Sequence, residues 1–212
     1  MFRFRSLIAF SFRRDLLDSF LNQNASLFYG NVLDVGGKKT RKRGVFRPPL
    51  KNVDNWHYLN NDIKNNPDIV SELPLIDAEN NSYDVVLLCE VIEYIFETDK
   101  LFKEIERVLK PKGTLIISSP LHHKIHGDHE CDYYRFTKSF FKKQLPRSNF
   151  SIVSIKEMGN IYHVIGDLIR KENKYFIFMT KLFLKLINKI SKEKNLTSQN
   201  ITTGYFIVAR KI

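Results

Sequence analysis

Apolar runs of strand length alternate along the chain with amphipathic helical stretches, and this alternation limits the possible folds more than any other feature of the sequence. The run 83–89 (YDVVLLC) is almost entirely apolar, which is typical of a strand buried on both faces of a parallel sheet. The stretch 99–110 repeats its apolar residues at helical spacing, on a face formed by Leu101, Ile105, Val108 and Leu109. Strands that alternate with helices predict an α/β fold, in which helices cover both faces of a mostly parallel sheet.

The remaining elements follow from the same patterns. Strands are predicted at 31–35, 56–59, 114–118, 151–156 and 204–210, and helices at 15–22 and from Thr137 through Leu145. Thr98 or Asp99 is expected to cap the helix 99–110, and Pro111-Lys112-Gly113 to end it. The 212 residues contain no repeat or Pro/Gly/Ser linker, which predicts a single domain over 1–212 with a helical insert at about 161–200.

The charge of +11 is unevenly distributed, because both ends of the chain are basic and the middle is acidic. Such basic ends suit an anionic substrate, an anionic membrane surface or a nucleic acid. The run Tyr175–Ile190 is apolar, but Lys181, Lys185 and Lys189 interrupt it at four-residue spacing. The segment 175–192 can therefore be a helix packed on its own domain, a homodimer contact, or an interfacial helix on anionic lipid.

The expected location is the cytoplasm, either free or peripheral to the inner face of the membrane. No run is apolar enough to span a bilayer, and the stretch between the arginines at the start is too short for a signal-peptide core. The two cysteines cannot form a disulfide framework, which fits a reducing compartment.

Polar residues follow the predicted strands where ligands of such sheets bind. Asp34 and Gly36-Gly37 end the first strand, Asp62 follows the second, and Glu90 follows 83–89. Glycine allows close approach of a ligand to the backbone, and an acidic residue after the second strand can accept both ribose hydroxyls. The glycine-rich patterns of dinucleotide and phosphate loops are absent. Carboxylates without a phosphate cradle predict a cationic nucleoside, and S-adenosylmethionine fits this description.

Over residues 31–150 the sequence resembles the class I S-adenosylmethionine-dependent methyltransferases of the type 11 kind. The matching stretches are VLDVGG, YLNNDI, DIVSELPL, NSYDVVLLCEVIEYI and LFKEIERVLKPKGTLIISSP. The resemblance implies a Rossmann-like, seven-stranded sheet whose last strand, 204–210, runs antiparallel. It also implies a cofactor site comprising Asp34, Val35, Gly36, Gly37, Asp62, Ile63, Glu72, Leu73 and Glu90. Two lysines follow Gly37 where the family has a further glycine, and Glu93-Tyr94 replaces a Glu-His pair.

The loop after the strand 114–118 is the candidate acceptor site. Its pattern H-G-x4-D-Y-x-R-F-T resembles a subgroup of these methyltransferases associated with glycans and the cell envelope. Histidine has a suitable pKa for a general base, so His126 is the predicted base, oriented by Asp132. Tyr134 and Arg135 are predicted to position the acceptor. Alternatively, Asp132, Tyr134 and Arg135 hold the loop in place. No metal is predicted, because the histidines and Cys131 lack the spacing of a structural site.

The sequence therefore predicts an enzyme that moves a methyl group from S-adenosylmethionine to an oxygen or nitrogen. The expected acceptor is a small molecule or a glycan, anionic or lipid-linked. Two alternatives remain open. An RNA- or DNA-modifying methyltransferase would also suit the basic ends, but the chain has no N-P-P-[YF] motif and no catalytic-cysteine arrangement. A non-catalytic binding or scaffold module on the same fold is the other.

Overall fold

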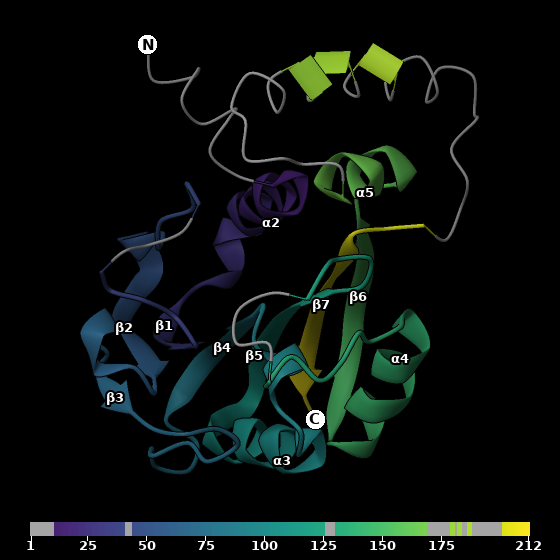
Figure 1. Cartoon of the computed structure of the whole chain (residues 1–212). Coiled ribbons are helices and arrows are strands. Elements are labelled where there is room, and N and C mark those ends of the chain that lie inside the picture. The colour runs from purple at the N-terminus through teal and green to yellow at the C-terminus, as the bar shows by residue number, and fades with distance from the viewer. Residues whose placement is uncertain are drawn as a thin grey trace.

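The computed structural model describes residues 11–40, 44–125, 130–168, 179–180, 182–183, 186–187 and 201–212. Their centre is one seven-stranded sheet in the order β3-β2-β1-β4-β5-β7-β6 (Figure 1). The strands are β1 (Gly30–Val35), β2 (Val53–Asn60), β3 (Ile69–Val70), β4 (Tyr83–Cys89), β5 (Leu109–Pro120), β6 (Phe150–Met158) and β7 (Gly204–Lys211). The five strands from β3 to β5 are parallel, and β7 runs antiparallel to both β5 and β6.

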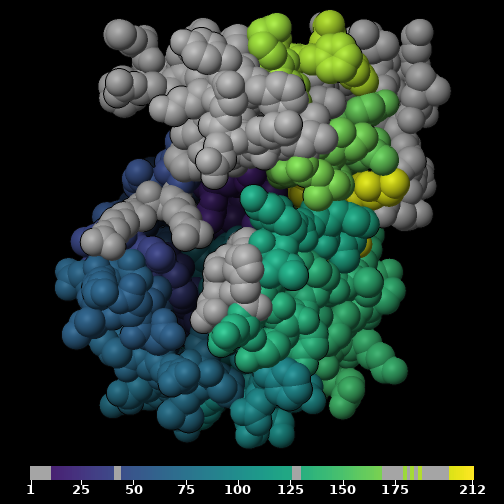
Figure 2. Space-filling model, in the orientation of Figure 1, coloured from purple at the N-terminus to yellow at the C-terminus, as the bar shows by residue number. Residues whose placement is uncertain are grey.

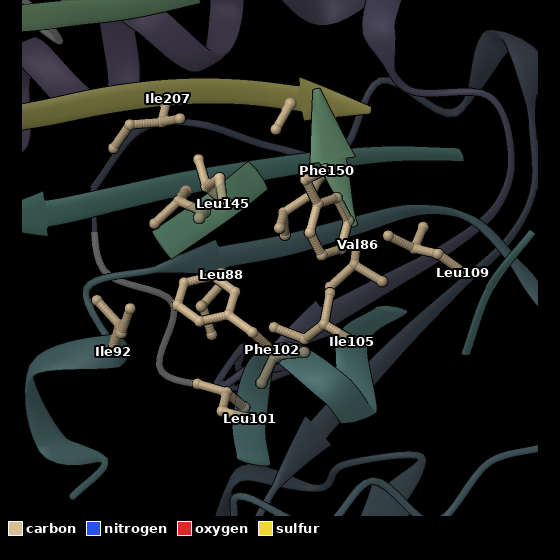
Figure 3. Packing of buried hydrophobic residues seen from close by; sticks show 14 of the residues in the cluster. Val86, Leu88, Ile92, Leu101, Phe102, Ile105, Leu109, Leu145, Phe150 and Ile207 are labelled. Atoms are coloured by element: carbon tan, nitrogen blue, oxygen red, sulfur yellow. The ribbon is translucent and has the colours of Figure 1, made fainter. Parts of the chain in front are cut away.

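Helices cover the two faces of this sheet, and the side chains of β4 alternate between them. Val86 and Leu88 face one core, which contains side chains of α3 (Thr98–Val108) and α4 (Lys138–Arg147) (Figure 3). Val85 and Leu87 face a second core, beneath α2 (Phe12–Gln23). A central strand buried on both faces must be apolar at every position, which explains the unbroken apolar run in its sequence. The helix α5 (Ile161–Leu168) follows β6.

The predicted fold class is confirmed, including the antiparallel last strand, and Thr137 caps α4 by accepting from the backbone N–H of Phe140. Two details of α3 were predicted wrongly. Its N-cap is Glu97, without a side-chain hydrogen bond, while the Asp99 carboxylate accepts from Gln144 of α4 at 2.6 Å. The helix also ends at Val108 rather than at residue 110.

The early end of α3 has a cause in the sheet. Leu109 already pairs with Tyr83 of β4, so β5 begins two residues before the Pro-Lys-Gly sequence. Lys112 adopts a φ of 64°, and the register with β4 shifts between Tyr83 and Val85. The turn expected to separate helix from strand is therefore an irregularity within β5.

The described residues also form four short 3-10 helices: η1 (Ala25–Leu27), η2 (Leu50–Asn52), η3 (Ile63–Asn65) and η4 (Ile92–Tyr94). Within the described ranges, no helix has the length and apolar character needed to cross a membrane. Most of the insert predicted at 161–200, and His126, lie outside the described residues.

Candidate active site

A cavity of about 820 Å³ opens where the carboxyl ends of β1, β2 and β4 meet. Part of α2 lies in a recess on this side of the molecule, between the blue N-terminal strands and the teal-green half (Figure 2). Seven of the nine predicted cofactor residues line the cavity: Asp34, Gly36, Gly37, Asp62, Glu72, Leu73 and Glu90. The other two do not line it, because Val35 is buried in the core and Ile63 is 74% exposed.

Neither glycine after β1 leaves room for a side chain, and Gly37 lies directly against the Asp34 carboxylate. A Cβ atom on Gly37 would lie 2.4 Å from the Asp34 Cγ, which real side chains cannot tolerate. Gly36 has a φ of 75°, and a Cβ there would lie 2.4 Å from a methyl group of Val91. The indole Nε1 of Trp56 donates to Asp34 Oδ2 at 3.3 Å and so orients the carboxylate. The backbone of Gly36 and Gly37 thus forms a glycine cradle beside the fixed carboxylate of Asp34.

Asn60, at the end of β2, joins the loop after β1 to the loop after β2. Its side-chain Nδ2 donates to the backbone carbonyls of Gly36 and Gly37, at 3.2 and 3.0 Å. Its Oδ1 accepts from the backbone N–H of Asp62 at 2.9 Å and from Asn65 Nδ2 at 3.3 Å. The Asn60 side chain is buried, so these four interactions have little competition from water.

Replacement of Asn60 by alanine is expected to weaken cofactor binding and stability together. Loss of the amide leaves carbonyl groups of the glycine turn without their donor, which costs about 1–3 kcal/mol for a buried polar group. Calorimetry of S-adenosylhomocysteine binding and urea unfolding would measure the two effects. Asn55→Ala is a matched control, because Asn55 donates to Asn31 at an exposed position on the same strand. Equal affinities of the two variants would contradict the positioning role of Asn60.

The second predicted aspartate, Asp62, both lines the cavity and caps η3. Its Oδ1 accepts from the backbone N–H of Lys64, and its Oδ2 accepts from Asn65. Of the two lysines after Gly37, Lys39 forms an ion pair with Asp68, whereas Lys38 lines the cavity. Burial favours the neutral form of Asp68, but the hydrogen bonds from Lys39 and from the backbone N–H of Tyr58, together with the charge of Lys39, outweigh this and lower the pKa of Asp68. This ion pair therefore fixes the ammonium group of Lys39 beside Asp68, directly before β3.

Glu90 lies at the tip of β4 and connects the cavity to α2. Its Oε1 accepts from Ser118 Oγ at 2.8 Å, and its Oε2 forms an ion pair with Arg13. Burial lowers the pKa of the Arg13 guanidinium to about 10, an effect that nearby Glu93 opposes. Arg13 could not be predicted as a site residue, because the sequence of an amphipathic helix does not show which strand end its arginine will contact.

Glu93 is a fully buried carboxyl group between the cavity and the candidate acceptor loop. Burial raises its pKa to about 7, while the positive charges of Arg13 and Arg135 act in the opposite direction. Its backbone carbonyl accepts from the N–H groups of Tyr133 and Tyr134, at 3.0 and 3.2 Å. Glu93 thus lies next to charged groups of α2 and of the loop, and its backbone anchors the loop.

The raised pKa of Glu93 predicts a loss of stability with rising pH. Between about pH 4.5 and 7 the folded chain retains a proton on Glu93 that the unfolded chain releases. The favourable contribution is therefore complete below pH 4.5 and lost as pH rises through 7. Glu93→Gln removes this titrating group. The free energy of unfolding in urea should therefore fall less between pH 5 and pH 7.5 in the variant than in the wild type, by roughly 1–3 kcal/mol. Parallel pH profiles would contradict the assignment.

In the loop that precedes α4, the structure supports the interpretation that Asp132 and Arg135 hold the backbone in place. Both carboxylate oxygens of Asp132 accept from the Arg135 guanidinium, at 2.5 and 2.7 Å. The same guanidinium donates to the backbone carbonyls of His123, Lys124 and Tyr134. Tyr134 packs against Phe96 and donates to its carbonyl at 3.4 Å. The predicted partner of Asp132, His126, lies outside the described residues, so this pairing stays a prediction.

Comparisons with known proteins agree with this geometry. Residues 52–117 match the family model of a methyltransferase domain. A search of curated proteins gives no match. An S-adenosylmethionine-dependent methyltransferase from Archaeoglobus fulgidus has a similar structure, with a TM-score of 0.59, 16% identity and 99% of each chain covered. One from Mesorhizobium loti has a TM-score of 0.54 and 13% identity, over 87% of this chain and 92% of the other.

A third similar structure shows that this fold also serves another reaction. The [4+2]-cyclase SpnF has a TM-score of 0.55 and 15% identity, over 92% of this chain and 79% of its own. Identities this low establish the shared fold alone, so the class of the protein depends on the family model together with the fold. Residues 52–117 match a methyltransferase domain, and the fold is that of solved S-adenosylmethionine-dependent methyltransferases, as the sequence predicted.

The cavity suits the cofactor expected of this class, S-adenosylmethionine. The glycine cradle opens onto a fixed carboxylate, Asp34, and a second carboxylate, Asp62, lines the same cavity. Glu90 adds a third carboxylate, and Leu73 an apolar wall. This donor set matches a cationic centre, a ribose diol and an adenine ring. Cys89 also lines the cavity, but burial raises the pKa of its thiol to about 12, so it is a poor nucleophile at neutral pH.

Proposed function

We propose that the protein methylates an oxygen or nitrogen of a sugar acceptor, either anionic or lipid-linked. The observation that carries this proposal is a group of aromatic side chains next to the cavity. Phe96 is 67% exposed and Tyr133 46% exposed, and their rings meet edge to face at 5.4 Å. Tyr134 stacks on Phe96 at 6.1 Å, and Ile95, which directly precedes Phe96 in the chain, lines the cavity. Exposed aromatic faces with polar tips suit the apolar faces and hydroxyl groups of a sugar ring.

Cationic side chains at the same cavity favour an acceptor that carries negative charge. Arg14 and Lys38 line the cavity in addition to Arg13; Glu90 pairs with Arg13, and Asp18 lies 3.9 Å from Arg14. A guanidinium or ammonium group binds phosphate and carboxylate groups through charge-assisted hydrogen bonds. An acidic sugar or a sugar phosphate would gain such contacts, whereas a neutral small molecule would not.

The roles of the chain's residues follow from this proposal. Asp34 and Asp62 hold the cofactor, which supplies an electrophilic methyl group when bound. His126 accepts the proton released by the acceptor hydroxyl or amine. Tyr134 contributes a stacking surface for the sugar. Arg135, with Asp132, keeps the loop in the conformation that presents these groups.

A labelling experiment tests the acceptor class. The protein is incubated with S-adenosylmethionine labelled in its methyl group and with three separate acceptor pools, namely lipid-linked glycans, water-soluble sugar phosphates and RNA. Label is expected in a sugar-containing pool, at a rate that falls by roughly 10²–10⁴ in His126→Ala if His126 is the base. Label confined to RNA, with a rate that decreases steeply with salt, would overturn the proposal in favour of nucleic-acid modification.

A further inference from the structure

Exposed apolar side chains form a stripe in the segment that follows α5. The described residues Met179, Leu182, Phe183 and Leu186 have helical backbone and are 56–62% exposed. Their positions are i, i+3, i+4 and i+7, which is the spacing of a single helical face. Scattered surface apolar residues are common in proteins, but four large ones on one face mark a surface that binds something apolar.

The helix α5 has an exposed apolar face and a second face that anchors α2. Ile165 and Leu168 are 40% and 59% exposed. On its buried side, the Asp167 carboxylate accepts from the backbone N–H groups of Phe12 and Arg13, at 2.7 and 3.0 Å. The pieces of the following segment lie beyond α5, at the end of the molecule opposite α3 (Figure 1). The apolar stripe therefore lies near α5, the helix that is hydrogen-bonded to α2, and α2 in turn lines the cavity.

The charge of the surrounding sequence identifies the kind of partner. Between residues 170 and 194 the chain has eight lysine or arginine residues and two glutamates. A second copy of this chain would bring the same positive charge to the interface, so association of two stripes would be opposed by repulsion. An anionic lipid surface offers the complementary charge together with an apolar interior, and each nearby basic residue adds to the attraction.

We propose that the segment around residues 179–186 binds the surface of an anionic membrane, with the side chains of the stripe inserted at the level of the lipid headgroups. Lysines in the same sequence would contact lipid phosphates. The helix α5 precedes this segment in the chain, and its Asp167 carboxylate accepts from the backbone N–H of Arg13 in α2. Because Arg13 also lines the cavity, the bound enzyme would hold the cavity near the lipid surface. The membrane contact goes beyond the proposed acceptor, and its test does not depend on which sugar is methylated.

Vesicle co-sedimentation of the full chain tests this inference. Vesicles of phosphatidylcholine with about one third phosphatidylglycerol are compared with vesicles of phosphatidylcholine alone, at ~0.1 M salt. The chain is expected to sediment with the anionic vesicles and to remain in solution with the neutral ones. Leu182→Ser together with Phe183→Ser should weaken binding at least about tenfold, since two large apolar side chains no longer insert.

The matched control replaces two equally exposed apolar residues elsewhere. Leu75 and Val153 are 65% and 58% exposed, and Leu75→Ser with Val153→Ser should leave vesicle binding unchanged. An unchanged circular dichroism spectrum verifies that each double variant is folded. Failure of the folded wild-type chain to bind anionic vesicles would overturn the inference. So would a concentration-dependent dimer in sedimentation velocity that the Leu182/Phe183 variant abolishes, because that result assigns the stripe to a second copy.

Discussion

Gly37→Ala is expected to weaken the binding of S-adenosylmethionine by at least about 100-fold, or about 2.8 kcal/mol, in a chain that still folds. The added Cβ would lie 2.4–2.7 Å from the carboxyl atoms of Asp34, so this side chain must rotate out of the cradle. Gly37 does not have a positive φ, unlike Gly36, and alanine therefore strains the backbone little. Calorimetric titration with S-adenosylhomocysteine measures the loss of affinity.

A double-mutant cycle with Asp34→Ala separates displacement of the carboxylate from general damage to the loop. If Gly37→Ala acts by moving Asp34, the double variant should bind as weakly as Asp34→Ala alone, and the two effects should not add. Additive effects would show that alanine disturbs the cavity in another way. Wild-type affinity in a folded Gly37→Ala variant would remove Asp34 from the cofactor site.

Arg135→Ala is expected to lower turnover with the sugar acceptor by about 100-fold or more, while cofactor affinity changes little. The guanidinium holds three backbone carbonyls of the loop and the Asp132 carboxylate, whose side chain is fully buried. Its removal leaves a buried carboxylate without this cation, which should also lower the free energy of unfolding by about 1–3 kcal/mol. Faster proteolysis near residues 121–137 would report the loosened loop directly.

Arg107→Ala is the matched control for this effect. Arg107 likewise donates to two backbone carbonyls, those of Ile76 and Ala78, and pairs with Glu104, but it lies on α3 away from the loop. It should lower stability while turnover per folded molecule stays unchanged. An equal loss of turnover in both variants would mean that the Arg135 effect reflects stability rather than loop position.

The sheet could be predicted from the sequence because the central strands β4 and β5 contain apolar runs and α3 has a clear apolar face. The short β3 was missed, since two residues contain no periodicity. The end of α3 was missed because the pairing of Leu109 with Tyr83 depends on a strand 26 positions earlier in the sequence. Local capping patterns do not show when pairing with a distant strand ends a helix early.

The candidate site was predictable where function depends on a residue at a strand end, as for Asp34 and Asp62. It was not predictable where function depends on burial and on contacts between distant segments. Glu93 belongs to the pair Glu93-Tyr94, which the sequence has in place of a Glu-His pair, but its burial between Arg13 and Arg135 exists only in the folded chain. Asn60 precedes Asp62 by two positions, and its side chain donates hydrogen bonds to two carbonyl groups in the loop after β1.

Calorimetric titration of the wild-type chain with S-adenosylhomocysteine tests the central claim most directly. We expect saturable binding of one ligand per chain, weakened by about 1–3 kcal/mol in Asp62→Ala through loss of charge-assisted hydrogen bonds. Absence of heat at millimolar ligand, with circular dichroism showing a folded chain, would contradict it. The carboxylates at the tips of β1 and β2 would then belong to a binding module that has the fold of a methyltransferase without its cofactor.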